Sequence, residues 1–204
     1  LAMGNPGSFA VQMRLARALN DAGDVTGAIA ALERAGLLMP AANGQANPNA
    51  IIAQLALKQG DTARAIRALD AVVKVDSSDV EAARKLAELV APSGDAARTA
   101  AAYALVAELD PFDGQAQAIV GRRALAQRDA TRARRALSAA LAAGPADKAT
   151  AHTDLAEALL MAGQMGDARR EALAALEIAP SFERAQDLLL KIIEAQPSGA
   201  GASP

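Results

Sequence analysis

A turn signal returns along this chain about every 34 residues, and this periodicity limits the possible folds more than any other feature. Each signal is a residue pair, usually Gly-Asp, followed by a segment rich in Ala and Leu. The pairs begin at Gly23, Gly60, Gly94, Arg128 and Gly163, so the intervals are 37, 34, 34 and 35 residues. A stop residue follows each pair after 17 residues: Pro40, Ser77, Pro111, Pro145 and Pro180. Because proline cannot continue a helix, these regular stops predict regular helix ends.

The apolar residues between these signals follow a helical period. Leu15 and Leu19 are four residues apart, as are Leu155 and Leu159, which places each pair on one helix face. We predict five helix pairs: 8–21 with 25–39, 48–59 with 62–75, 79–90 with 96–109, 114–127 with 130–143, and 148–162 with 167–179. No stretch alternates with a period of two, so no strand is predicted.

The composition agrees with closely packed helices. Hydrophobic residues make up 52% of the 204 residues, but aromatic residues make up only 2%, so Ala, Leu, Val and Ile must form the core. Ala and Leu favour helices. The formal net charge is −2, which provides no general attraction to nucleic acid or to an anionic membrane. The chain has no cysteine, so neither a disulfide nor a thiolate metal site can form.

Neither a membrane span nor a targeting segment is predicted. The apolar stretches are far shorter than the roughly 18 residues that a membrane-spanning helix needs. The first residues contain neither a basic region nor an apolar run, so no signal peptide is expected in this sequence. Because the sequence begins with Leu1, we expect a fragment of a longer chain. A cytoplasmic and a periplasmic location both stay open.

The order of residue types within each unit resembles the tetratricopeptide repeat (TPR). In that family a large residue, a leucine and a small residue mark the first helix, a glycine marks the turn, and a proline closes the unit. The fullest match lies in the last unit and consists of His152, Leu155, Ala156, Leu159, Gly163, Ala168, Ala172, Ala175 and Pro180. The resemblance implies an all-α fold, namely a right-handed α-solenoid of about five helical hairpins plus a C-terminal capping helix.

The repeats divide the chain into four parts. Residues 1–8 are expected to be flexible, 9–182 to form the repeats, 183–195 to form the capping helix, and 196–204 to be a disordered tail. The repeat bounds are 9–42, 46–79, 80–113, 114–147 and 149–182. The Gly- and Asn-rich segment 41–47 is about three residues too long for the repeat, so a mobile loop is expected there.

The expected capping helix carries more apolar residues than one helix face can hide: Leu188, Leu189, Leu190, Ile192 and Ile193. Glutamate at both Leu188 and Ile192 is expected to preserve the fold if these two side chains point outward. The surplus apolar surface then predicts self-association through this helix, or its docking to another domain.

No catalytic constellation stands out, and we expect neither an enzyme nor a cofactor or metal site. His152 is the only histidine, and it occupies a packing position of the repeat, so a structural role is favoured over general-base catalysis. Asp154 and Glu157 are three residues apart on one helix face. We expect them to be solvated surface acids rather than a catalytic pair.

In proteins that this chain resembles, the first helices line a concave groove in which peptides bind. The candidate partner-binding residues on that face are Met13, Arg14, Arg17, Ile51, Gln54, Arg84, Lys85, Ile119, Arg122, Asp154 and Glu157. Their mixture of apolar and charged side chains suits an acidic and hydrophobic protein segment. A nucleic-acid ligand is not expected, because aromatic residues for base stacking are absent from this face.

A second surface is rich in arginine. Its members lie in the fourth unit and are Arg122, Arg123, Arg128, Arg132, Arg134 and Arg135. A solvated face with carboxylate neighbours is favoured there over a docking patch for an acidic partner.

Two functions remain open at this point. The first is a protein-interaction scaffold that binds a peptide segment or a partner domain in its concave groove. The second is a non-catalytic module of a larger bacterial protein, which packs against or positions a catalytic or envelope-assembly domain. The bacterial origin is suggested only by the high Ala and Arg content.

Overall fold

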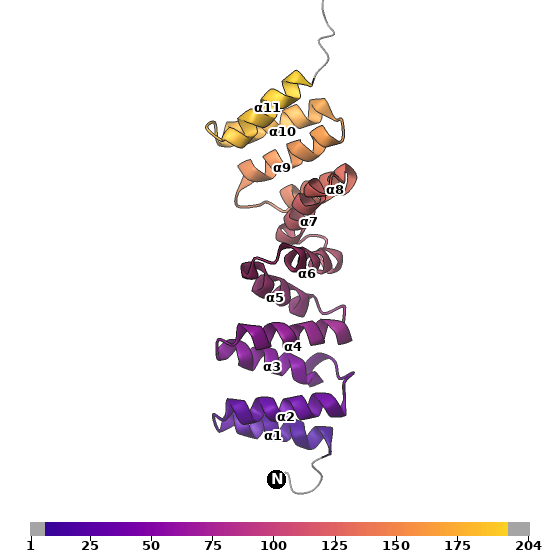
Figure 1. Cartoon of the computed structure of the whole chain (residues 1–204), viewed down its shortest axis with the longest axis vertical. Helices are drawn as coiled ribbons and strands as arrows, with labels where there is room; N and C mark the ends of the chain where they lie inside the picture. Colours follow the sequence, from indigo (N-terminus) through magenta and orange to yellow (C-terminus); the bar gives the residue numbers. More distant parts are fainter. Residues whose placement is uncertain (1–6, 196–204) are drawn as a thin grey trace, which may run out of the picture. The chain divides into compact units, whose positions relative to one another are not determined.

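The computed structural model describes residues 7–195, and within that range it contains eleven α-helices and no strand (Figure 1). The predicted all-α helical-repeat fold is confirmed. Residues 1–6 of the expected flexible segment and the expected tail 196–204 lie outside the described residues. The chain divides into two compact units, residues 1–102 and 103–204, with the boundary inside the sixth helix.

The first unit contains five complete helices and the beginning of a sixth. These are α1 (Phe9–Asp21), α2 (Val25–Leu38), α3 (Pro48–Lys58), α4 (Thr62–Val75), α5 (Val80–Val90) and the start of α6 (Ala96–Leu109), with short 3₁₀ helices η1 (Gly44–Ala46) and η2 (Ala91–Ser93). Each of the first four helices packs against the next one in sequence. Ile29, Leu32 and Leu69 lie in the shared core, so consecutive hairpins bury one another's apolar faces.

The second unit contains the end of α6 and five further helices. These are α7 (Gly114–Ala126), α8 (Ala130–Ala142), α9 (Lys148–Met161), α10 (Met165–Ile178) and α11 (Glu183–Glu194). α7 packs against α8, α8 against α9, and α9 against α10, while α11 packs against both α10 and α9. The apolar core of this unit includes Leu137, Leu155 and Ile192.

The repeated Gly-Asp pair has two structural roles, which explain its regular spacing. Gly60 has a φ of 74°, a left-handed conformation that glycine adopts without steric cost. The aspartate that follows caps the next helix, because the Asp61 carboxylate accepts a hydrogen bond of 2.9 Å from the Arg64 N–H. Asp24 caps α2 and Asp129 caps α8 in the same way. Arg128 replaces the glycine of the fourth pair and takes the same left-handed conformation, with a φ of 59°.

The fifth turn lacks this cap, which allows the role of the cap to be tested. Gln164 stands at the N-cap of α10 and makes no side-chain hydrogen bond there. Gln164→Asp is expected to raise the free energy of unfolding by about 1 kcal/mol, because the new carboxylate can accept a free backbone N–H. Urea unfolding followed by circular dichroism measures the change. The matched control, Asp129→Gln, should lower the free energy of unfolding by a similar amount, and unchanged midpoints in both variants would contradict the capping role.

Polar contacts replace aromatic packing at two positions where the repeat usually carries a large side chain. Buried Gln12 on α1 accepts a hydrogen bond of 3.2 Å from Arg34 Nε on α2. Half-buried His152 on α9 places its Nδ1 2.7 Å from Glu171 Oε2 on α10. Both contacts join the first helix of a hairpin to its second, so His152 has the structural position that the sequence predicted.

The loop between the first two hairpins, where the sequence predicts a mobile segment, contains a short helical turn. Segment 41–47 contains the 3₁₀ helix η1, and both Ala42 and Asn47 are buried. The Asn47 side chain also accepts a hydrogen bond of 2.9 Å from the Asn49 N–H at the start of α3. The extra residues therefore form a short turn that is anchored to the unit.

Leu188 and Ile192 do not point outward, so the condition under which glutamate at both positions would preserve the fold is not met. Leu188 is only 7% exposed and Ile192 is fully buried, and both belong to the apolar core of the second unit. Leu190 and Ile193 are the exposed apolar residues of α11, at 58% and 48%. Leu188 and Ile192, four residues apart, lie on the face of α11 that packs against α9 and α10, whereas Leu190 and Ile193 lie on the exposed face.

Candidate partner-binding surfaces

A hollow of about 370 Å³ lies between α1 and α3 in the first unit, and we call it the α1–α3 hollow. Its apolar lining is formed by Met13, Ala16, Leu32, Ile51 and Leu55, and its polar lining by Arg14, Arg17 and Asn20. Four of the predicted partner-binding residues, namely Met13, Arg14, Arg17 and Ile51, are thus brought together. Leu32 and Leu55 are buried, so the floor of the hollow is part of the core.

The α1–α3 hollow carries positive charge that is not neutralised. Arg14 and Arg17 are exposed, and neither forms an ion pair with any of residues 7–195. They lie three residues apart on α1, which places both guanidinium groups on the same helix face. The hollow has no acidic residue in its lining. A carboxylate that enters it can therefore accept paired N–H donors from an arginine without displacing another acid.

The other predicted residues of the first unit lie outside this hollow. Gln54 is exposed on α3. On α5, Arg84 forms an ion pair of 3.0 Å with Glu81, and Lys85 forms one of 3.0 Å with Glu88. These two cations are already paired within their own helix, so they attract a partner less strongly than Arg14 and Arg17 do.

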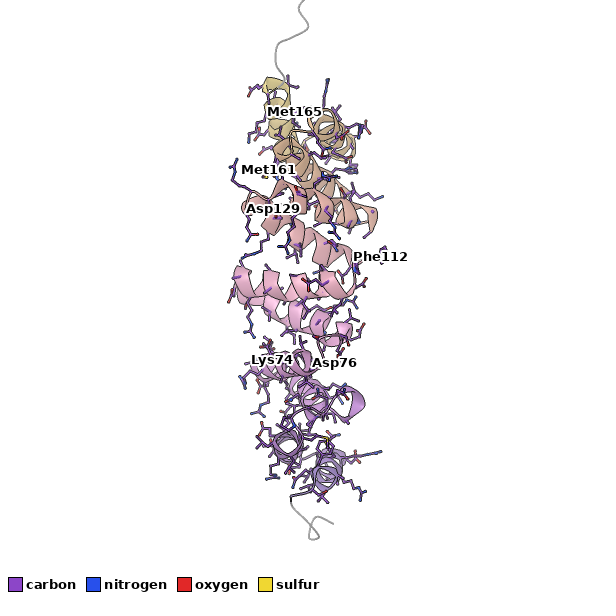
Figure 2. All side chains as sticks on the ribbon, turned by 90° about the vertical axis from the view of Figure 1, so that its right-hand side faces the viewer. Lys74, Asp76, Phe112, Asp129, Met161 and Met165 are labelled. Atoms are coloured by element: carbon purple, nitrogen blue, oxygen red, sulfur yellow. The ribbon has the colours of Figure 1, made fainter. Side chains whose placement is uncertain are left out.

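A second hollow, of about 540 Å³, lies between α7 and α9 in the second unit. Of the predicted residues, Arg122 and Asp154 line it, whereas Ile119 and Glu157 do not. Phe112, which is 89% exposed, also lines this hollow and lies in the loop between α6 and α7. Its side chain is labelled in Figure 2. The lining of this hollow contains the basic Arg122 and the acidic Asp147 and Asp154. Arg122 is paired with Asp154, unlike the unpaired arginines of the α1–α3 hollow.

Asp147, also in the lining of this second hollow, is held by the start of α9. The side chain and the backbone N–H of Thr150 donate hydrogen bonds to the Asp147 carboxylate. These bonds lower the pKa of Asp147, because they stabilise its charged form. Asp147 therefore keeps its negative charge and acts as the N-cap of α9.

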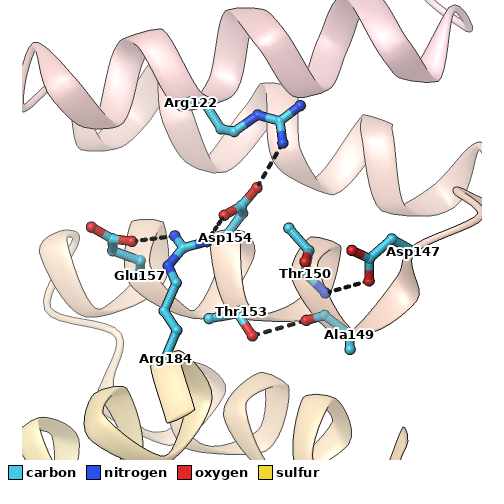
Figure 3. A network of polar contacts seen from close by, with 8 residues as sticks. All are labelled: Arg122, Asp147, Ala149, Thr150, Thr153, Asp154, Glu157 and Arg184. Carbon is cyan, nitrogen blue, oxygen red and sulfur yellow. Dashed lines mark hydrogen bonds and ion pairs between the residues drawn. The ribbon is translucent and has the colours of Figure 1, made fainter. Parts of the chain in front are cut away.

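The expectation that Asp154 is a solvated surface acid is wrong (Figure 3). Its side chain is buried between Arg184 of α11, at 2.5 Å, and Arg122 of α7, at 3.8 Å. Arg184 also donates to Glu157 at 2.7 Å. Burial disfavours the charge on Arg184, but the hydrogen bonds to Glu157 and Asp154 outweigh it and raise the pKa of Arg184. This network joins α7, α9 and α11, so Asp154 has a structural role.

Arg184 is the residue of this network that sequence reasoning missed. It lies 30 residues after Asp154, in the predicted capping helix, and an ion pair between different repeats leaves no local spacing signal. Within residues 7–195, no three histidine or carboxylate side chains gather as a metal site would require. None of the described helices is both long and apolar enough to cross a bilayer.

Two members of the arginine-rich surface line a further hollow, of about 390 Å³, in the second unit. Arg132 and Arg135 of α8 line it together with Glu108 and Ala104 of α6. Glu108 supplies the carboxylate neighbour that was expected there. Arg132 and Arg135 lie on a second helix, whereas Arg122 and Arg123 of the same predicted surface lie on α7, which is a first helix. The two hollows described above lie between first helices.

Comparison with known proteins agrees with this architecture. The family model of the tetratricopeptide repeat matches residues 1–46, 52–114 and 121–181. The solved structure of MamA is 25% identical, with a TM-score of 0.54, over 70% of this chain and 83% of that protein. YrrB, a TPR protein with an unusual peptide-binding site, is 14% identical, with a TM-score of 0.54, over 90% of this chain and 92% of its own. At that identity, the likeness to YrrB shows the fold alone. No curated protein matches the chain.

Proposed function

Because the chain belongs to the tetratricopeptide repeat family, we propose that it is a protein-interaction scaffold that binds an acidic and hydrophobic partner segment against its first helices. The α1–α3 hollow carries this proposal. It combines an apolar lining with two exposed arginines that have no ion pair among residues 7–195. A single segment with alternating apolar and acidic groups satisfies both features.

The bound segment would place apolar side chains against Met13, Ile51 and Leu55, and carboxylates beside Arg14 and Arg17. Burying one large aliphatic side chain contributes roughly 1.5–3 kcal/mol. Association also costs several kcal/mol of translational and rotational freedom. One hollow alone therefore supports only weak binding, because the association cost cancels much of the gain from a few buried side chains. The other candidates of the first unit are Gln54 on α3 and Arg84 and Lys85 on α5. The candidates Ile119 and Arg122 on α7 and Glu157 on α9 belong to the second unit and form a separate proposed surface.

A second proposal is that the chain is a non-catalytic module that packs against another domain of a larger protein. Exposed apolar residues on the second helices of the first unit favour it. Leu37 on α2 is 81% exposed, and with Val75 on α4 it lines an open hollow of about 500 Å³. Such apolar surface is of the kind that a neighbouring domain covers. Leu37→Glu would weaken that packing and leave peptide binding at α1 and α3 unchanged.

The scaffold proposal predicts that a fluorescent acidic amphipathic peptide, with Leu and Glu at three- and four-residue spacing, binds the full chain. Fluorescence anisotropy should show that Arg14→Glu with Arg17→Glu weakens binding at least about tenfold, a loss of about 1.4 kcal/mol. Added salt should weaken binding as well, since exposed charges are screened. The thermal melt should stay nearly unchanged, because both arginines are exposed.

The matched control reverses two arginines on the second helices, Arg132→Glu and Arg135→Glu, and should retain peptide binding. Loss of binding in this control, with full binding in the Arg14 and Arg17 variant, would locate the ligand at α6 and α8 and contradict the proposal. Absence of binding to the unmodified chain would also contradict it.

A further inference from the structure

The exposed face of α11 carries acidic residues, which are absent from the lining of the α1–α3 hollow. The helix buries Ala185, Leu188 and Ile192 in its own unit and exposes Leu190 and Ile193 on the other side. Three exposed carboxylates accompany the exposed apolar pair, and none forms an ion pair with residues 7–195: Glu183, Asp187 and Glu194. Lys191 is the one exposed cation of α11 that is not held by a carboxylate.

These exposed residues form one continuous stripe. Glu183, Asp187, Leu190 and Glu194 follow three- and four-residue spacing, so they lie above one another on the helix surface. The stripe carries an apolar centre between acidic groups. The α1–α3 hollow offers the complement, an apolar floor with Arg14 and Arg17 beside it.

The two elements also match in length. α11 has 12 residues and α1 has 13, and at 1.5 Å per residue both are about 18–20 Å long. A helix laid along α1 and α3 can therefore present its whole stripe to the hollow. Helix-in-groove recognition uses this arrangement of anchors at three- and four-residue spacing.

We propose that α11 of one copy docks in the α1–α3 hollow of a second copy of this chain. Leu190 and Ile193 then contact Met13 and Ile51, while Asp187 and the neighbouring carboxylates pair with Arg14 and Arg17. The inference rests on the proposed function, since it names one occupant of the same hollow. It also gives the exposed apolar pair of α11 a defined partner surface.

A symmetric contact between two α11 helices explains the exposed apolar pair less well. Such a contact would bring Glu183, Asp187 and Glu194 of one copy against the same carboxylates of the other, and like charges in close contact are unfavourable. Docking of α11 in the hollow of another copy joins two different surfaces. Each copy then keeps one free hollow or one free α11, so assembly continues into open chains or closes into a ring.

The test uses two variants of the full chain with complementary defects. The hollow variant carries Arg14→Glu and Arg17→Glu, and the stripe variant carries Leu190→Glu and Ile193→Glu. Sedimentation velocity at up to about 1 mM, where even weak interfaces are populated, should show concentration-dependent oligomers for the unmodified chain and monomers for each variant alone. An equal mixture of the two variants should form a heterodimer and nothing larger, because only one intact hollow and one intact α11 remain.

Several results would overturn this inference. Self-association of the hollow variant alone would indicate a symmetric or unrelated interface, and a monomeric unmodified chain would remove docking between copies. If the unmodified chain is monomeric, the fluorescent-peptide titration tests the proposed function separately. Peptide binding by the monomer would support the scaffold function, and absence of binding would contradict both the scaffold function and the docking of α11. If the hollow variant is not folded by circular dichroism, Arg14→Gln with Arg17→Gln replaces it. Leu37→Glu is the matched surface control and should assemble like the unmodified chain.

Discussion

Glutamate at both Leu188 and Ile192 is expected to unfold the end of the second unit, whereas glutamate at both Leu190 and Ile193 should leave it folded. Leu188 and Ile192 are buried against α9 and α10. Their apolar burial contributes roughly 1.5–3 kcal/mol each, and two buried carboxylates without partners add several kcal/mol more. The free energy of unfolding of this region should therefore fall by at least about 4 kcal/mol.

Hydrogen exchange across residues 148–194 measures this effect most directly, because helical repeats open locally before the whole chain unfolds. Amides of α9, α10 and α11 should exchange much faster in the Leu188 and Ile192 variant. Those of α1 to α4 should exchange at the unmodified rate. Equal protection of α11 in both double variants would mean that the two faces of this helix are not distinguished by burial.

Arg184→Ala is expected to lower the free energy of unfolding by about 2–3 kcal/mol. Breaking a buried ion pair by removing one partner typically costs about 3–5 kcal/mol, and the partial exposure of Arg184 reduces that figure. Asp154 would stay buried with only Arg122 nearby, at 3.8 Å. The variant also removes the contact that ties α11 to Glu157 on α9. Urea unfolding monitored by circular dichroism gives the value.

Two further variants compare the stability contribution of the Arg184 and Asp154 network with that of an exposed ion pair. Arg170→Ala removes an exposed ion pair with Asp167 inside α10, and should cost less than about 1 kcal/mol. Adding Asp154→Leu to Arg184→Ala should restore part of the lost stability, since no unpaired carboxylate then remains buried. If Arg184→Ala proves as mild as Arg170→Ala, the buried position of Asp154 does not depend on Arg184.

The helix pattern could be predicted closely from sequence because its signals are local. Gly60 takes a left-handed turn and Asp61 caps α4 through a residue only three positions away. Such interactions depend on neighbours in the chain and repeat wherever the same residues repeat. Predicted helices 62–75 and 96–109 therefore coincide with α4 and α6.

The candidate site could be predicted only in part. Helical spacing placed Met13, Arg14 and Arg17 on one face of a first helix, and the repeat placed Ile51 on the next one. The floor of the hollow was missed, since Leu32 and Leu55 read as ordinary core residues until the helices are packed. The pairing of Arg84 with Glu81 was missed although the two residues lie three apart on one helix, a spacing that the sequence shows.

Paired helices at a regular interval follow from the amino-acid sequence alone, because glycine conformation, aspartate caps and proline stops act over a few residues. The buried face of α11, in contrast, depends on how the helices pack. Its apolar residues support either phase, and contact with α9 and α10 selects Leu188 and Ile192 over Leu190 and Ile193. The tertiary structure likewise decided the position of Asp154, whose partner Arg184 comes from another repeat. Both outcomes depend on the packing of segments distant in sequence, which no local pattern encodes.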